Sequence, residues 1–183
     1  MKHNNQLPNK LCKLLSEDSL IILLFHGVID KQIDKVRNYT NKHIQKDLFA
    51  QCIKQLSNYG NPLSMDEVLF HLENKLPFPK HSFAITFDDG FENNLSIAAP
   101  ILDEFNIPAT IYVTSDFIDN NHMSWIDRIE YSVQNLAPSS FDFKWINQKI
   151  LLDSNESRIE FLKQVRSFVK SEPSCNPNEF AIN

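Results

Sequence analysis

The stretch SFAITFDDGFENN, residues 82–94, places two adjacent aspartates directly after an apolar run and directly before a glycine. Residues 83–87 have the apolar side chains of a buried strand, and the letters DDGF break that pattern. Beyond the break, apolar residues recur at helical spacing up to Phe105, and NIPATIYVT (106–114) is typical of another strand. A strand, a helix and a strand in this order predict a βαβ unit with parallel strands, and therefore an α/β fold.

The segments before this unit fit the same fold class. LIILLF (20–25) is a continuous apolar run of strand length, which predicts a parallel strand covered on both faces. Residues 46–59 have helical spacing, and Gly60 follows where a helix commonly stops. Ser64 and Glu67 form a capping-box pattern, which predicts a second helix that ends before Pro77.

The segments after the unit change in character. Residues 125–136 predict a helix, and FDFKWINQKILL (141–152) alternates apolar and polar positions around Asn-Gln, which predicts a β-hairpin. A helix capped by Asp153 and Glu156 is expected next, and the tail shows no periodicity. We therefore expect a single domain over residues 1–183, with its core at 20–135, a hairpin and helix at 141–171 and a polar tail at 172–183.

Composition excludes several classes of function. The formal net charge is -5, and the lysines and arginines form no cluster, so a nucleic-acid partner is not expected. The longest aliphatic run is much shorter than the roughly 20 residues that span a bilayer, and the polar start lacks a signal peptide's apolar region. These features predict a cytoplasmic chain without a transmembrane segment. Cys12, Cys52 and Cys175 contain no C-x-x-C pair and are interpreted as buried thiols.

Asp88 and Asp89 follow a strand, at the position where parallel α/β folds bind ligands. Successive residues leaving a strand point in different directions, so one carboxylate can bind a cation while the other faces a water held by that cation. Gly90 suits a sharp exit toward the next helix. The alternative is that Asp88 caps this helix and Asp89 is simply solvated.

The residues AITFDDGF (84–91) resemble the first signature of the polysaccharide deacetylase family, also called the NodB-homology domain or carbohydrate esterase family 4. Three further segments resemble parts of the family: LLFHGVI (23–29), FNIPATIYVTSDFID (105–119) and MSWIDRIEYSV (123–133). The resemblance covers roughly residues 20–135. It implies a (β/α) barrel of the NodB deacetylase type, which we expect here as a partial barrel with a small β-hairpin and helix inserted after the third strand.

The resemblance also implies a function. Members of the family remove acetyl groups from N-acetylated sugars with a divalent metal, usually zinc. Carried over to this chain, Asp88 matches the general base and Asp89 the metal ligand. The family's mechanism has the base deprotonate a metal-bound water, and the backbone N–H near Phe91 is a candidate donor to the resulting oxyanion.

Three further residues are candidates for the same site. His26 follows the first strand and is predicted to reach the mouth of the barrel, where it binds substrate or metal; the alternative is a hydrogen-bonded, partly buried histidine. Trp125 and Asp127 are candidates for a sugar-binding groove, and the alternative for Trp125 is a place in the core.

The match lacks one part of the family's pattern. The family completes its metal site with two histidines four residues apart after the signature, whereas no two histidines of this chain have that spacing: His3, His26, His43, His71, His81 and His122. A catalytic zinc site usually needs three protein ligands, so the Zn2+ site is incomplete in this chain. We interpret the chain as the N-terminal portion of a deacetylase domain, with its activity as this chain left open.

This interpretation has a consequence for assembly, because the unpaired sheet edge of a partial barrel would favour a homodimer. An alternative function, from another class, is a non-catalytic glycan-binding or assembly module built on the same fold.

Overall fold

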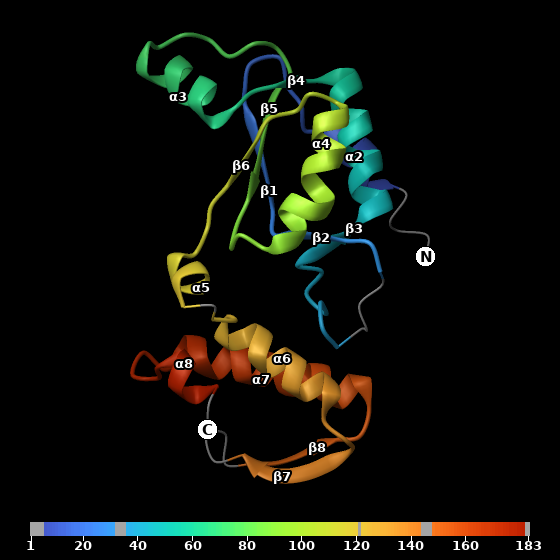
Figure 1. Cartoon of the computed structure of the whole chain (residues 1–183), viewed down its shortest axis with the longest axis vertical. Coiled ribbons are helices and arrows are strands. Elements are labelled where there is room, and N and C mark those ends of the chain that lie inside the picture. The colour runs from blue at the N-terminus through green and yellow to red at the C-terminus, as the bar shows by residue number, and fades with distance from the viewer. Residues whose placement is uncertain (1–5, 32–35, 121, 144–147, 182–183) are drawn as a thin grey trace. The chain divides into compact units, whose positions relative to one another are not determined.

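The computed structural model describes residues 6–31, 36–120, 122–143 and 148–181. The chain forms two compact units, one made of Met1–Gln32 and Asn41–Thr114 and the other of Ile33–Thr40 and Ser115–Asn183 (Figure 1). The division falls inside the core expected at residues 20–135. It leaves the single-domain prediction undecided, because two compact units can belong to one domain.

The first unit is built on a parallel sheet whose central strand is β5 (Ser82–Phe87). Strand β1 (Ile21–Phe25) pairs with β5 from Ile21 opposite Phe83 to Phe25 opposite Phe87. Strand β4 (Asn61–Pro62) pairs with the first two residues of β5, and β6 (Ala109–Ile111) pairs with its last three. The predicted parallel βαβ unit is therefore confirmed, and all of β5 is buried.

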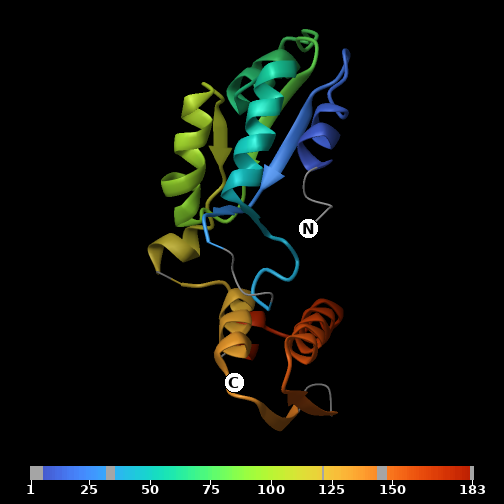
Figure 2. The same cartoon turned by 90° about the vertical axis from the view of Figure 1, so that its right-hand side faces the viewer.

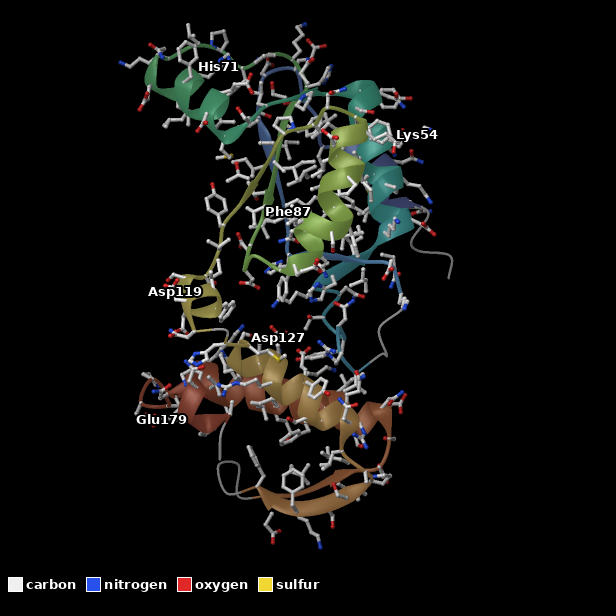
Figure 3. The ribbon with its side chains drawn as sticks, in the orientation of Figure 1. Lys54, His71, Phe87, Asp119, Asp127 and Glu179 are labelled. Carbon is white, nitrogen blue, oxygen red and sulfur yellow. The ribbon has the colours of Figure 1, made fainter. Side chains whose placement is uncertain are left out.

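Helices cover one face of this sheet. Helix α2 (Lys46–Tyr59), the π-helix η2 (Asn94–Ala98) and α4 (Ala99–Glu104) lie against it, and α1 (Leu7–Cys12) packs on α2 (Figure 2). They enclose an apolar core that includes Phe49, Ile53, Leu56, Phe83, Ile85, Phe87, Ile101 and Leu102. Figure 3 labels Phe87 on β5 at this interface.

The opposite face of the sheet is open at β1. Side chains alternate along a strand, and Ile22 and Leu24 point away from the helices and are 49% and 54% exposed. The prediction that this strand is covered on both faces is thus wrong for the part of the chain that the structure describes. The continuous apolar run of β1 does not by itself report how many layers cover it.

Two local predictions in the first unit are confirmed. Helix α2 ends at Tyr59, directly before Gly60. Helix α3 (Met65–Glu73) begins with the predicted capping box, in which the Ser64 Oγ accepts a hydrogen bond from the Glu67 N–H and the Glu67 carboxylate accepts one from the Ser64 N–H. The carboxylate also accepts a hydrogen bond from the Ser64 Oγ, and the bonds from the Ser64 N–H and Oγ hold the pKa of Glu67 below its usual value, because they favour its charged form.

The second unit contains the predicted helix, hairpin and helix, together with two short helices. It comprises α5 (Ser115–Asp119), α6 (Trp125–Asn135), the antiparallel pair β7 (Ser139–Phe143) and β8 (Gln148–Leu152), α7 (Asn155–Ser171) and α8 (Pro177–Phe180). Its core combines Val36, Val133, Ile150, Leu152, Phe161, Leu162 and Val165.

Details of the second unit differ from the sequence predictions. Gln148 pairs with Phe143 as part of β8, so it does not form the turn of the hairpin, and Trp145 lies outside the described residues. Helix α7 is capped by Ser154, whose Oγ accepts from the Ser157 N–H, and not by Asp153. Serine competes well with aspartate at this position, so neighbouring capping residues are hard to rank from sequence. The tail contains α8, which is too short to show periodicity.

A buried arginine links α7 to the end of α6 by hydrogen bonds. Arg158 of α7 is 7% exposed, and its guanidinium donates to the carbonyls of Val133, Gln134 and Leu136 at the end of α6. The last carbonyls of a helix have no partner within the helix. Arg158 therefore supplies donors to carbonyls at the end of α6, of which the bond to Val133 is buried and those to Gln134 and Leu136 are partly buried.

We predict that Arg158→Met destabilises the second unit by about 2 kcal/mol, because it leaves the buried Val133 carbonyl and two partly buried carbonyls without their donor. The measurement is urea denaturation followed by tryptophan fluorescence, since Trp125 packs beside this core. Lys163→Met is the control on the same helix, because Lys163 is exposed and should change stability by less than about 0.5 kcal/mol. Equal stability of the two variants would contradict the role given to Arg158.

The three cysteines are free, and Cys52 is buried as predicted, whereas Cys12 and Cys175 are partly buried. Burial raises the pKa of Cys52 to about 12 from 9.0, and the pKa of Cys12 is raised for the same reason. Because the raised pKa keeps the thiol protonated at every pH well below that value, little reactive thiolate is present near neutrality.

We predict that Cys52 in the folded chain reacts with Ellman's reagent at pH 8 about a thousandfold more slowly than an unfolded cysteine. Release of the coloured thiolate with and without denaturant measures this rate, and Cys52→Ser identifies the signal. Rapid labelling of Cys52 in the folded chain would show that its thiol is accessible and ionised.

Candidate active site

The two aspartates lie at the carboxyl edge of the parallel sheet. The Asp88 N–H donates to the Phe25 carbonyl at 3.0 Å, which continues the β1 pairing one step beyond the strand. On β6, the Tyr112 N–H donates to the Phe87 carbonyl at 2.8 Å. His26 directly follows Phe25, so it reaches the same edge as Asp88. The backbones of His26, Asp88 and Asp89 therefore lie at the same edge of the sheet, and the roles of their side chains stay predictions.

The backbone turns sharply after Asp88. Asp89 and Gly90 both have φ at +71°, in the left-handed region. Aspartate tolerates this region better than most residues, and glycine adopts it freely. A Cβ at residue 90 would lie 2.8 Å from the Val113 side chain, so Gly90 is required for space as well as for conformation.

The helix-capping alternative for Asp88 is not supported. Within the described part of the chain, the Asp88 side chain makes no hydrogen bond or ion pair, and the following helix begins without a side-chain cap at Asn93. Asp88 is half-buried at the sheet edge. Its carboxylate is therefore available to a ligand rather than to the helix.

Asp89, in contrast, is engaged. The Lys42 Nζ lies 2.9 Å from the Asp89 Oδ2, and the two side chains are 18% and 29% exposed. The same Nζ lies 4.5 Å from the centre of the Phe91 ring, which is cation–π range. The His43 ring meets Phe91 edge-on at 4.8 Å. Phe91 thus packs between Lys42 and His43, and its side chain helps to hold the lysine.

Two short strands that the sequence did not reveal hold this cluster in place. Strand β2 (Gly27–Ile29) pairs in parallel with β3 (His43–Gln45), with Gly27 opposite His43. A Cβ on Gly27 would collide with the His43 ring and lie 2.8 Å from the Asn93 Oδ1, the atom that accepts a hydrogen bond from the Val28 N–H. Gly27 therefore permits the close approach that brings Lys42 to Asp89.

The described residues do not form a zinc site by themselves. No group of three or more histidine, cysteine, aspartate or glutamate side chains is placed to hold a metal ion in residues 6–31, 36–120, 122–143 and 148–181. Asp89 supplies one carboxylate, and that carboxylate is paired with an ammonium group. A catalytic zinc needs about three protein ligands, so this donor set does not fit the metal.

The remaining sequence candidates belong to the second unit. Asp127 lies on α6, as Figure 3 shows, where its N–H donates to the Ser124 Oγ and its carboxylate accepts from that hydroxyl. It therefore helps to cap α6. Trp125 is half-buried beside the second unit's core. Sugar binding by Trp125 and Asp127 stays a prediction.

Comparison with known proteins places the chain in a family. A model of the polysaccharide deacetylase family matches residues 75–167, half of the chain. The chain therefore belongs to the polysaccharide deacetylase family, as its TFDDG motif indicated.

Individual relatives agree with this assignment. The poly-beta-1,6-N-acetyl-D-glucosamine N-deacetylase of Staphylococcus aureus (strain MSSA476) is 30% identical over 96 residues, which are 52% of this chain and 32% of the relative. The chain thus spans about a third of the length of the curated relatives it matches. Among solved structures, the Streptococcus pyogenes deacetylase PplD in complex with acetate is 26% identical, with a TM-score of 0.50, over 63% of this chain and 52% of that chain.

Sequence reasoning missed Lys42, His43 and Gly27. Lys42 and His43 precede or begin a three-residue strand, and a strand so short has too little periodicity to be recognised. The one available signal was Gly27, because glycine is rare in this chain, at 3 of 183 residues, and this one directly follows a candidate site residue.

We predict that Gly27→Ala destabilises the chain by about 1–3 kcal/mol, because the added methyl group forces His43 and Asn93 apart. Urea denaturation followed by circular dichroism measures the loss. Lys46→Ala is the control, since Lys46 is exposed at the start of α2 and its change should be below about 0.5 kcal/mol. A Gly27→Ala variant as stable as this control would mean that the β2–β3 contact is not tight.

Proposed function

We propose that this chain is part of a hydrolase that removes N-acetyl groups from carbohydrate, with Asp88 as the catalytic base. One observation carries the proposal. Asp88 leaves β5 within the family's TFDDG motif, at the carboxyl edge of a parallel sheet, with its carboxylate uncommitted to any other described side chain. Ligands of parallel α/β folds bind at this edge.

The reaction follows from the position of this carboxylate. Water adds to the carbonyl carbon of the acetamido group while its proton passes to Asp88, which gives a tetrahedral oxyanion. The C–N bond then breaks while the nitrogen takes up the proton that Asp88 accepted, so that acetate and the amino sugar leave and the carboxylate is restored. We propose the Phe91 N–H as a donor to the oxyanion and His26 as a substrate contact at the same edge.

The family's metal enters the proposal only through Asp89. A divalent cation, Zn2+ by resemblance, would supply Lewis acidity to this reaction. Because the described residues provide one carboxylate for it, we propose that the other ligands lie outside them. We also propose a partial barrel, a place for Trp125 and Asp127 in the sugar groove, a homodimer through the sheet edge and a cytoplasmic location.

Among the described residues, no helix combines the length and apolar character that crossing a bilayer requires.

The alternative function, a non-catalytic glycan-binding or assembly module, is less favoured, because the family and the S. aureus relative point to de-N-acetylation.

The test is release of acetate from an oligomer of β-1,6-linked N-acetylglucosamine by the 183-residue chain, with and without added Zn2+ or Co2+. We predict that Asp88→Asn lowers the rate by about 10²–10⁴-fold, as loss of a general base does. Glu92→Gln is the matched control, since it removes an exposed carboxylate four residues away, at the start of the following helix, and should leave the rate within about twofold.

Two outcomes would contradict the proposal. The first is that the chain releases no acetate under any metal condition. The second is that Asp88→Asn and Glu92→Gln retain the same rate, which would show that hydrolysis does not depend on Asp88.

A further inference from the structure

Lys42 lies against one oxygen of the Asp89 carboxylate. Its ammonium lies 2.9 Å from the Asp89 Oδ2 and 4.5 Å from the centre of the Phe91 ring. The carboxylate and the aromatic face both attract a cation, so the ammonium has two favourable neighbours. At 18% exposure, the Lys42 side chain is largely withdrawn from solvent, and salt screens such a pair less than a surface pair.

The fold, and not the lysine alone, fixes this contact. Lys42 directly precedes β3, and β3 is held against β2 with Gly27 opposite His43. Asp89 is fixed from the other side by the left-handed turn at residues 89 and 90. Both partners therefore approach each other from restrained backbone, which lowers the entropy lost in holding the pair together.

We propose that Lys42 is the resident cation of Asp89 and acts as an autoinhibitory contact that any metal ion must displace. The proposal rests on the proposed function only for the role of Asp89 as a metal ligand. The ammonium pairs with one of the two carboxylate oxygens, and its charge would repel an approaching divalent cation. The first unit thus contains the deacetylase motif, but the motif's expected metal ligand, Asp89, is paired with a lysine.

The test is titration of the 183-residue chain with ZnCl2 or CoCl2 by isothermal calorimetry. Lys42→Met should bind the metal at least about tenfold more tightly than the unsubstituted chain, because the competing charge is gone. Lys46→Met is the matched control, since it removes an exposed lysine four residues away and should change the affinity by less than about twofold. Adding Asp89→Asn to Lys42→Met should abolish the gain.

A second measurement needs no metal. Nuclear magnetic resonance of the lysine side chains should show the Lys42 Nζ signal shifting in Asp89→Asn and staying in place in Glu92→Gln. Lys42→Gln serves as a second neutral variant if Lys42→Met folds poorly, and circular dichroism checks the folding of each.

Three results would overturn the proposal: equal metal affinity of the unsubstituted chain and Lys42→Met, no metal binding by either, or a Lys42 signal insensitive to Asp89→Asn. None of these readouts requires substrate. If the chain releases no acetate but Lys42→Met binds the metal tenfold more tightly, the Lys42 proposal stands and the proposed function is wrong. If the chain releases acetate but Lys42→Met shows no gain in metal affinity, the proposed function stands and the Lys42 proposal is wrong.

Discussion

The candidate site depends on the parallel pairing of β5 with β1 and β6. Parallel strands in register end at one edge, so the residues that follow Phe25, Phe87 and Ile111 emerge on the same side of the first unit. Burial of all six residues of β5 fixes that register, because a slip by one residue would move every apolar side chain of the strand to the other face. The position of Asp88 is therefore a consequence of the core behind it.

Charge balance is the second constraint on the edge. Two adjacent carboxylates repel each other, and the repulsion grows when water is partly excluded. Lys42 offsets it from a segment more than forty residues earlier in the chain, which β2 and β3 bring into place. The two neighbours therefore differ: Asp89 forms an ion pair with Lys42, whereas the Asp88 side chain has no hydrogen bond or ion pair among the described residues. Family membership explains the presence of both acids, and the ion pair is a property of this chain.

The sequence predicted those parts of the fold that repeat a pattern over many residues. The βαβ unit around Asp88, the capping box at Ser64 and the amphipathic α6 and α7 were all recognisable because periodicity or a cap motif marks them. It did not reveal β2 and β3, whose three residues pair only through tertiary contact, and so it missed Lys42. It also predicted two covered faces for β1, since an apolar run does not report whether Ile22 and Leu24 have neighbours.

The positive φ of Asp89 has a consequence for any mutational survey of this motif. Asparagine and glycine can inherit that backbone, whereas valine, isoleucine or threonine would be disfavoured there before any question of chemistry arises. The effect of a substitution at residue 89 would therefore combine a backbone effect with the loss of the carboxylate. Only a comparison between asparagine and aspartate separates them, because that pair differs in charge while sharing shape.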